Sequence, residues 1–352
     1  MLKSMNAFHA SRPELRASRH FRGVAAASAL ALVSTTFLIT SAVGAPITVG
    51  YSAPFLSSQF EITLQDGTVA EAARAGFTML APTNADMDSG KQITDINNLI
   101  SAGAKGIIVV VNDSHAIIPA LDAAAAANVP VVSVDIGPDG GKVAAIVRAD
   151  NIGMGVMACE DMAKAIGKKG KVLSLMGAAT SINGRERTQG FHDCMKKYKN
   201  ITLIERPTDW DPAKQVAALQ TVLTANPDLK GFFMQSDWAL SPTLNVLKQA
   251  KRYVKVGQKG HIYAISIDAG PQSLALVRAG ILDAEISQPL DLYIKYGVRY
   301  LKEAIAGQAL RVGPTDHGTK VVLFNGNPMD LLPATLVTKT NVNSPKLWGN
   351  QG

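Results

Sequence analysis

Residues 128–136 read Asn-Val-Pro-Val-Val-Ser-Val-Asp-Ile. The four valines form an apolar run without alternation, which is typical of a strand covered on both faces in a parallel sheet. The run ends at Asp135, and the turn-forming pair Gly137-Pro138 follows. Ligands of open α/β sheets bind beyond the carboxyl ends of the strands. Asp135 is therefore a candidate ligand contact, and a cap for the turn is the equally simple alternative.

Apolar β-branched runs and amphipathic helical patterns alternate on both sides of this strand. Because such alternation is typical of doubly wound parallel sheets, we predict an α/β fold with two units in series, joined near Asp150. In the first unit, strands are expected at 47–51, 77–81, 106–111 and 144–147, and helices at 60–75, 91–102 and 117–127. In the second, strands are expected at 171–176, 201–206, 231–234, 262–267 and 283–287, with late strands at 321–324 and 334–338.

The composition indicates a globular chain with a large buried core. Of the 352 residues, 47% are hydrophobic and 18% are charged, which argues against extensive disorder. The formal net charge is +7, but five basic residues and one glutamate within the first 22 residues account for +4 of it. The remaining +3 forms no basic stripe, so we expect no nucleic-acid partner.

Twenty uncharged residues, Val24–Val43, follow the basic N-terminal segment. Small residues at Ala42 and Gly44 fit an export cleavage site, which predicts a signal peptide over residues 1–44 and a periplasmic mature protein. An uncleaved membrane anchor is the alternative, since about twenty residues can span a bilayer. The run is only weakly apolar because it contains six Ser or Thr residues, and this favours the cleaved signal.

The chain contains two cysteines, Cys159 and Cys194, on the two helices expected to open the second unit. Because an exported protein folds in an oxidising compartment, we predict a disulfide between them. Two buried free thiols are the alternative. No Cys/His spacing predicts a metal site.

Two patterns imitate known binding motifs without completing them. Residues 153–158 (GMGVMA) match part of a dinucleotide fingerprint, but no acidic residue ends a following strand at the required distance. Residues 86–90 (DMDSG) resemble the start of a calcium loop but lack its later glutamate. No catalytic motif is present. The sequence therefore predicts a protein that is not an enzyme and has no cofactor or metal.

Polar and aromatic residues stand at the ends of several predicted strands in both units. They are Asp135, Trp210, Asp237, Asp268 and Gln288, each before a break or a helix. Five such residues from two units suggest two sheets that face each other across a cleft. A lining of hydrogen-bond acceptors with an aromatic ring suits a ligand rich in hydroxyl groups.

Eight short stretches, in order along the chain, match one family of binding proteins. They are FEITLQDG (60–67), NVPVVSVD (128–135), ADN (149–151), GRERTQGF (184–191), DWD (209–211), QSD (235–237), ID (267–268) and SQP (287–289). On these stretches the chain resembles the periplasmic sugar-binding proteins of ABC transporters, in the ribose-binding type I group. The similarity runs from about Ile47 to Val342.

The resemblance implies two lobes joined by a hinge of three crossovers, with a sugar bound between them. The N-terminal lobe would comprise residues 45–149 and 289–332, and the C-terminal lobe residues 150–288 and 333–345. Residues 346–352 would form a tail. The resemblance also implies a monomer that delivers its sugar or polyol to the transmembrane subunits of an ABC permease.

The family pattern also implies roles for individual side chains. Phe60 and Trp210 would stack on the two faces of the sugar, and Asp135 and Asp268 would accept hydrogen bonds from its hydroxyl groups. Gln288 would bridge near the hinge.

An arginine is expected to donate to the ligand. The resemblance favours Arg187, with Arg185 as the alternative. From the residues alone, a surface salt bridge of Arg187 with Glu186 or Asp193 is the simpler interpretation.

The chain departs from the ribose-binding pattern at several positions. Ser57-Ser58 replaces a pair of asparagines, Glu61 replaces a second aromatic residue, and Ile136 replaces an arginine beside Asp135. Asn112 lies two residues beyond the position of another family asparagine, and Ser236 replaces a further one. The expected ligand contacts are Ser58, Phe60, Glu61, Asn112, Asp135, Arg185 or Arg187, Trp210, Ser236, Asp237, Asp268 and Gln288.

These departures change the expected ligand. Ile136 supplies no donor, and Glu61, if ionised, adds an acceptor near the entrance. An alternative is that Glu61 points to solvent and Ile136 only packs. With fewer donors in the site, we expect weak ribose binding and a preference for a polyol, a deoxy or branched pentose, or an amine-bearing sugar.

Three other function classes compete with transport. A ligand-sensing component for a chemoreceptor or sensor kinase would share the fold. An effector domain of a gene regulator would need a helix-turn-helix where this chain has its export signal. An oxidoreductase would depend on the incomplete glycine pattern at 153–158.

Overall fold

The computed structural model describes residues 46–351. The predicted signal peptide and its cleavage site lie outside this range. Within it, no helix is long and apolar enough to cross a bilayer. The same residues contain no group of His, Cys, Asp or Glu side chains that could hold a metal ion.

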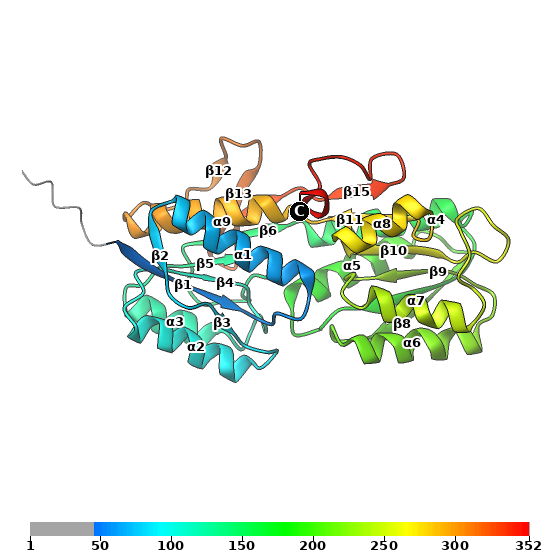
Figure 1. Ribbon diagram of the computed structural model, residues 1–352, viewed down its shortest axis with the longest axis horizontal. Coiled ribbons are helices and arrows are strands. Elements are labelled where there is room, and N and C mark those ends of the chain that lie inside the picture. Colours follow the sequence, from blue (N-terminus) through cyan, green and yellow to red (C-terminus); the bar gives the residue numbers. More distant parts are fainter. Residues whose placement is uncertain (1–45, 352) are drawn as a thin grey trace, which may run out of the picture. The chain divides into compact units, whose positions relative to one another are not determined.

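The first sheet has the strand order β12-β13-β14-β6-β5-β4-β1-β2, with β3 beside β1. Helices α1 and α9 lie along one side of it, and α2 and α3 along the other (Figure 1). We call this assembly the N-terminal lobe. Its strands are β1 (Ile47–Ala53), β2 (Phe77–Met79), β3 (Thr83–Asn84), β4 (Ile107–Val109), β5 (Val131–Val134), β6 (Ala145–Ala149), β12 (Gly313–Pro314), β13 (Lys320–Phe324) and β14 (Asn327–Leu332). Its helices are α1 (Gln59–Arg74), α2 (Ser89–Ser101), α3 (Ile118–Ala126) and α9 (Leu290–Ile305).

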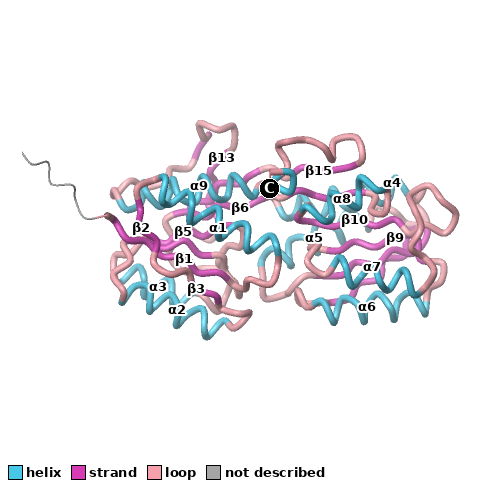
Figure 2. The backbone as a smooth tube through the Cα atoms, viewed as in Figure 1, coloured by secondary structure: helices cyan, strands magenta, loops and turns pink. Residues whose placement is uncertain are grey.

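The second sheet has the order β15-β11-β10-β9-β7-β8 and is parallel except for β15. We call it, with its helices, the C-terminal lobe, in which α6 and α7 lie side by side (Figure 2). Its strands are β7 (Gly170–Met176), β8 (Ile201–Pro207), β9 (Leu229–Met234), β10 (Tyr263–Asp268), β11 (Ala284–Ser287) and β15 (Thr335–Thr338). Its helices are α4 (Asn151–Ala165), α5 (Ile182–Met195), α6 (Pro212–Ala225), α7 (Leu240–Gln249), α8 (Pro271–Ala279) and the 3-10 turn η1 (Trp348–Asn350).

These two sheets confirm the predicted α/β fold with two parallel-sheet lobes. The opening valine run forms β5, in which every residue is buried. The chain passes between the lobes three times: from β6 to α4, from β11 to α9 and from β14 to β15. The Asp150 carboxylate caps α4 at the first passage by accepting a hydrogen bond from the Gly153 backbone N–H.

The sequence patterns did not predict β14, which carries the third passage. Pro328 and Asp330 interrupt its apolar pattern, and such residues are uncommon inside a buried strand. Asp330 is nevertheless fully buried, and its carboxylate accepts hydrogen bonds from the Tyr300 hydroxyl at 2.8 Å and the Thr319 hydroxyl at 2.5 Å. Tertiary partners therefore make this strand possible.

Gly155, within the glycine pattern at 153–158, serves helix packing together with Gly190 on α5. A Cβ atom at Gly155 would overlap the carbonyl oxygen of Arg187, and one at Gly190 would overlap that of Ile152. The two glycines therefore let α4 and α5 approach backbone to backbone. This packing accounts for the pattern without a dinucleotide.

Cys159 on α4 and Cys194 on α5 form a disulfide, as predicted, with their Cα atoms 6.1 Å apart. They are 35 residues apart in the sequence, so the crosslink closes a loop for which chain entropy gives a stabilisation of about 3–4 kcal/mol. We expect a reductant, or the double replacement of both cysteines by alanine, to lower the urea midpoint accordingly. Equal midpoints with and without reductant would show that the crosslink adds no stability.

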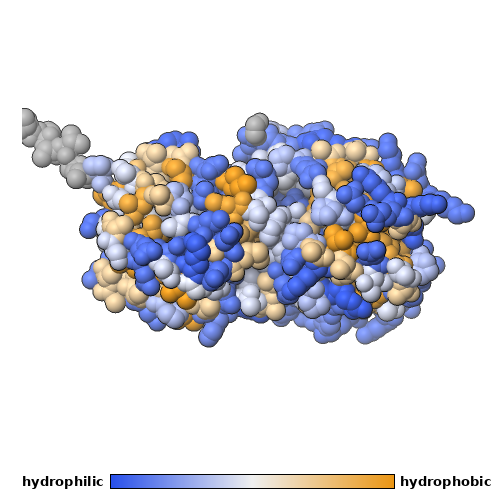
Figure 3. All heavy atoms as spheres, turned by 60° about the horizontal axis from the view of Figure 1, so that its bottom comes forward, coloured by the Kyte–Doolittle hydropathy of each residue, from blue (hydrophilic) through white to orange (hydrophobic). Residues whose placement is uncertain are grey.

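Large exposed apolar side chains are scattered among the described residues, and include Val256, Val312 and Leu323. On the face in Figure 3, apolar residues occur in groups separated by polar ones. Single exposed apolar residues are normal for a soluble surface.

Candidate functional site

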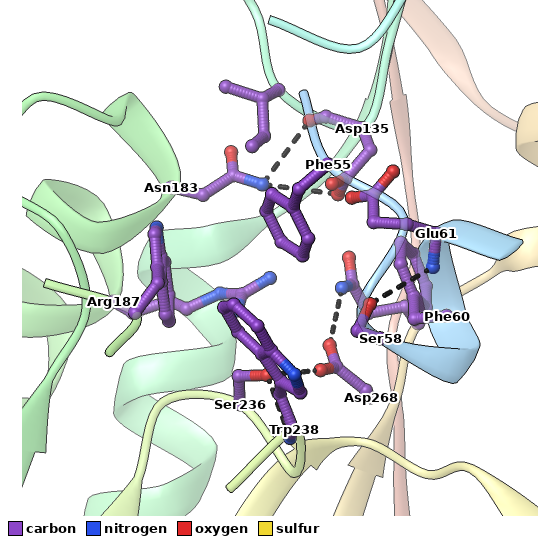
Figure 4. Close-up of a pocket in the computed structure, with 13 residues that line it drawn as sticks. Phe55, Ser58, Phe60, Glu61, Asp135, Asn183, Arg187, Ser236, Trp238 and Asp268 are labelled. Carbon is purple, nitrogen blue, oxygen red and sulfur yellow. Dashed lines mark hydrogen bonds between the residues drawn. The ribbon is translucent and has the colours of Figure 1, made fainter. Parts of the chain in front are cut away.

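A cavity lies where the carboxyl ends of the strands of both lobes meet (Figure 4). Its empty volume, including space open to solvent at its mouth, is about 410 Å³. The lining residues are Phe55, Ser58, Phe60, Glu61, Asp135, Ile136, Asn183, Arg187, Trp210, Ser236, Trp238, Asp268 and Gln288.

The loop after β1 and the first turn of α1 supply one wall. Ser58 is the N-cap of α1, where its hydroxyl accepts a hydrogen bond from the Glu61 backbone N–H at 3.2 Å. This cap fixes the start of the helix. Phe60 and Glu61 are consequently held in its first turn, where both side chains are buried and line the cavity.

Helix α5 supplies the opposite wall. Asn183 and Arg187 are four residues apart and so share one face of this helix. The Arg187 guanidinium donates to the Asn151 side-chain oxygen at 2.7 Å and to the Gln235 carbonyl oxygen at 2.6 Å. It also lies 5.6 Å from the centre of the Trp210 ring. These contacts hold a buried cation in one orientation within the cavity.

The ends of β10 and β11 supply the floor. The Asp268 carboxylate accepts hydrogen bonds from the Ser236 hydroxyl and the Gln288 amide, each at 2.7 Å. The Gln288 amide oxygen in turn accepts from the Tyr293 hydroxyl at 3.0 Å. Since Gln288 stands at the second passage between the lobes, this chain of hydrogen bonds couples the floor of the cavity to the hinge.

Aromatic side chains come from both lobes. Phe55 and Trp238 stack on each other, with ring centres 4.6 Å apart. Phe60 meets Trp348 edge to face at 5.8 Å. The Trp210 ring packs directly against Gly177, where any side chain would overlap it. The cavity therefore has apolar surfaces on several sides that can cover the C–H face of a ligand.

Three carboxyl groups share the cavity with a single lining guanidinium. Burial raises the pKa of Asp135 to about 7; Arg187 lowers it and Asp268 raises it further. Burial also raises the pKa of Asp268, against the influence of Arg187 and of its two hydrogen bonds. Burial, followed by the charges of Asp135 and Asp268, raises the pKa of Glu61 well above its usual range. Burial in the empty site therefore makes every one of its carboxyl groups harder to ionise than a free carboxyl group.

Three of the lining residues have a left-handed backbone. The φ angles are 59° at Asp135, 58° at Trp210 and 111° at Asp268. A non-glycine residue in this region costs free energy and is typical of functional sites. Strain at three strand ends that meet at one cavity supports this cavity as the candidate site.

Direct contacts join the two lobes beside the cavity. Arg148 on β6 is almost fully buried; it donates to the Glu186 carboxylate at 2.6 Å and to the Asn183 side-chain oxygen at 2.8 Å. The Ser114 hydroxyl accepts from the Ile182 backbone N–H at 3.0 Å. The lobes therefore touch through groups of the protein itself.

Nine of the expected contacts line the cavity, and three do not. The nine are Ser58, Phe60, Glu61, Asp135, Arg187, Trp210, Ser236, Asp268 and Gln288. Arg185 is exposed and pairs with Asp139, so of the two arginines only Arg187 lines the cavity. Asn112 donates to the Ser89 hydroxyl instead.

Asp237 is likewise engaged elsewhere. Its carboxylate accepts hydrogen bonds from the Gly270 backbone N–H at 2.9 Å and the Ser273 hydroxyl at 2.8 Å. It thus stabilises the start of α8, where a negative charge is favourable. In the structure, Asp237, Asn112 and Arg185 are therefore hydrogen-bonded outside the cavity, and their expected ligand contacts stay predictions.

Several side chains at the site had no signal in the sequence analysis. Phe55 and Trp238 stand in loops, and Asn183 lies one helical turn before Arg187. Trp348 belongs to the segment predicted as a tail, yet it is buried and its indole N–H donates to the Asp268 carbonyl oxygen at 2.6 Å. Asn183 could have been predicted, because a residue four positions before Arg187 lies on the same face of a helix.

Comparisons with known proteins agree with this architecture. The periplasmic binding protein domain matches residues 49–309. The ribose import binding protein of Escherichia coli strain K12 is 28% identical over 284 residues, which cover 81% of this chain and 92% of that protein. The D-apiose import binding protein of Actinobacillus succinogenes is 30% identical over 278 residues, covering 76% and 87%.

A solved structure shows the same fold. It is an ABC transporter solute-binding protein from Mycobacterium smegmatis with bound glycerol, which matches with a TM-score of 0.74 at 25% identity. The match covers 85% of this chain and 96% of that one.

Proposed function

We propose, since the chain belongs to the periplasmic binding protein family, that it captures a small sugar or polyol between its lobes and delivers it to an ABC import permease. Relatives that are import binding proteins for ribose and D-apiose support the class of ligand. The relative with bound glycerol extends that class to polyols.

The composition of the cavity carries this proposal. Three carboxyl groups, two amides, two hydroxyl groups and a guanidinium converge on one small space whose apolar surfaces are mostly aromatic. Hydroxyl groups both donate and accept hydrogen bonds, so each can pair with such a lining, while the rings cover the C–H faces of the ligand. Phe60 and Trp210 are the proposed stacking residues, with Asp135, Arg187, Asp268 and Gln288 as the proposed polar contacts.

The proposal includes binding without catalysis. The relatives are named as binding proteins, which supports binding rather than catalysis. The same relatives support a location outside the cytoplasm, in the periplasm or its equivalent. We propose export by a cleaved signal peptide that ends at Gly44, in the part of the chain outside the described residues. A sensory role beside a chemoreceptor or sensor kinase is the alternative use of the same fold.

A thermal-shift panel tests the ligand class. A ligand at about 100 times its dissociation constant adds roughly 2.7 kcal/mol to the free energy of unfolding, which corresponds to a rise of several degrees in melting temperature. We expect such a rise with at least one neutral polyol or pentose among glycerol, erythritol, D-apiose, 2-deoxy-D-ribose and D-ribose, and the smallest rise with D-ribose.

Sugar phosphates serve as the comparison compounds, because the site has excess carboxyl groups that would repel an anion. A shift with these and none with any sugar or polyol would contradict the proposal. Loss of uptake of the stabilising compound in a deletion strain would then separate transport from a purely sensory role.

A further inference from the structure

The Glu61 side chain differs from the other two carboxyl groups of the cavity in its hydrogen bonds. It is 3% exposed, and its Oε2 atom is buried without a hydrogen-bond partner among the described residues. The Tyr51 hydroxyl is also buried and unpartnered in this part of the chain. Burying a carboxylate without a donor is costly. An ionised Glu61 would therefore be destabilised in this position, because no hydrogen-bond donor among the described residues reaches its Oε2 atom.

The two aspartates are better supported as anions. Asp135 accepts from the Asn183 amide at 3.1 Å, and Asp268 accepts from Ser236 and Gln288. The positive charge of Arg187 lowers the pKa of both aspartates, against the effect of burial. Three neighbouring carboxyl groups with one guanidinium between them cannot all be ionised cheaply, so the proton belongs on the group with the fewest donors.

We propose that Glu61 binds the ligand as a neutral carboxylic acid, with its O–H donating to an oxygen of the bound molecule. This inference rests on the proposed function, since it assumes a sugar or polyol in the cavity. It replaces the expectation of an ionised Glu61 that acts only as an acceptor. A neutral carboxyl group both donates and accepts, so it supplies the donor that Ile136 does not.

The groups around Glu61 agree with this assignment. Asp135 faces it from the end of β5 and Asp268 from the end of β10, both as negative charges that raise its pKa after burial itself. Tyr51 on β1 is a further titratable neighbour: burial first, and then the charges of Glu61, Asp135 and Asp66, raise the pKa of its hydroxyl. Arg187, the cation that lines the cavity in the described part of the chain, donates its hydrogen bonds to Asn151 and Gln235 rather than to Glu61.

The proposal narrows the ligand class. The molecule is uncharged and places a hydroxyl, ether or carbonyl oxygen toward Glu61. A protonated amine at this position would instead pair with an ionised Glu61. Rising pH ionises Glu61, removes its donor and adds a negative charge beside two others, so affinity for the neutral ligand is lost.

The protonation state can be measured without any ligand. Carbon-13 NMR of protein labelled only at the glutamate carboxyl carbons keeps the aspartates out of the spectrum, and the signal lost in Glu61→Gln assigns Glu61. We expect this signal at the position of a neutral acid at pH 7. A Glu61 signal at the ionised position would overturn the proposal, whatever the ligand.

The pH dependence of the stability of the ligand-free protein is a second test of the protonation of Glu61. A folded-state pKa above the unfolded value of 4.5 means that the folded chain holds the proton longer, so stability falls as pH rises from there toward the folded-state pKa. Glu61→Gln should abolish this part of the fall and raise the melting temperature at neutral and alkaline pH. Glu71→Gln, further along the same helix and away from the cavity, where Glu71 is half-buried and pairs with Arg74, should keep the wild-type slope.

Binding completes the test, with D-apiose and glycerol as the probes in calorimetric titrations between about pH 5 and pH 9. The association constant of the wild type should fall by up to about tenfold per pH unit above the pKa of Glu61. Glu61→Gln should flatten the profile, while Glu71→Gln should follow the wild type. A wild-type profile that Glu61→Gln leaves unchanged, or an affinity that rises with pH, would overturn the inference.

The outcomes separate this inference from the proposed function. If no sugar or polyol binds at any pH, the proposed function fails, and the NMR signal still decides the protonation of Glu61. If a probe binds but Glu61 is ionised, the proposed function stands and only the neutral-acid role is lost.

Discussion

Replacing Arg187 with alanine should abolish ligand-induced stabilisation and weaken binding about 100-fold or more. Truncating one member of a buried, hydrogen-bonded charge pair costs roughly 2–5 kcal/mol, and 100-fold corresponds to about 2.7 kcal/mol. Arg187 is 3% exposed and is the only guanidinium lining the cavity within the described chain. Its removal leaves Asp135 and Asp268 without their main opposing charge.

Arg185→Ala is the matched control. Arg185 lies two residues away on the same helix but outside the cavity, where it forms an exposed ion pair with Asp139 of the N-terminal lobe. An exposed ion pair contributes at most about 1 kcal/mol. The ligand affinity and the melting temperature of the Arg185→Ala variant should stay close to those of the wild type. If Arg187→Ala keeps wild-type affinity, or Arg185→Ala loses it, the assignment of the two arginines is reversed.

The Arg187→Ala variant should also lose stability at neutral pH and recover part of it in mild acid. Without the guanidinium, the pKa values of Asp135 and Asp268 rise further, and protonation removes their mutual repulsion. Urea unfolding of the unliganded variant across this pH range measures the effect.

Trp210→Ala should remove most of the ligand-induced rise in melting temperature while changing the unliganded melt little. A tryptophan that covers a ligand in a desolvated site contributes about 2 kcal/mol or more to binding. The ring is only half-buried in the empty protein, and its residue has a φ angle of 58°, so little native stability depends on it.

Two further variants sharpen this test. Trp210→Phe keeps an aromatic face and should retain part of the shift. Gly177→Ala should reproduce part of the loss with the ring intact, because the added methyl group would overlap the indole. A collapse of the unliganded Trp210→Ala protein would show that the ring stabilises the fold rather than the ligand.

Much of the fold was predictable because buried parallel strands have a strong local signal. The unbroken valine run of β5 and the alternation around it predicted both sheets. β14 was missed because its buried Asp330 is stabilised by Tyr300 and Thr319, which come from elsewhere in the sequence. Local pattern carries no information about such partners.

The candidate site was predictable where it follows the ends of strands. Asp135, Asp268 and Gln288 stand there, and the topology of a parallel sheet brings such positions together. Phe55 and Trp238 were missed because they lie in irregular segments, and Trp348 because it lies in a single short 3-10 turn; tertiary packing sets the path of such segments. The protonation of Glu61 was equally inaccessible, since it depends on three carboxyl groups from distant parts of the chain.

The contact of Arg148 with Glu186 and Asn183 has a consequence for the efficiency of uptake. It joins the lobes without help from a ligand, so it would favour this arrangement over any form in which the lobes separate. Apparent affinity rises with the fraction of molecules already in the binding-competent form, which favours scavenging at low external concentration. The same contact raises the number of empty, closed copies that compete with loaded ones for the transporter. A substitution that weakens this guanidinium–carboxylate pair would therefore lower the apparent affinity for the ligand. It would also reduce the number of encounters between empty protein and the transporter.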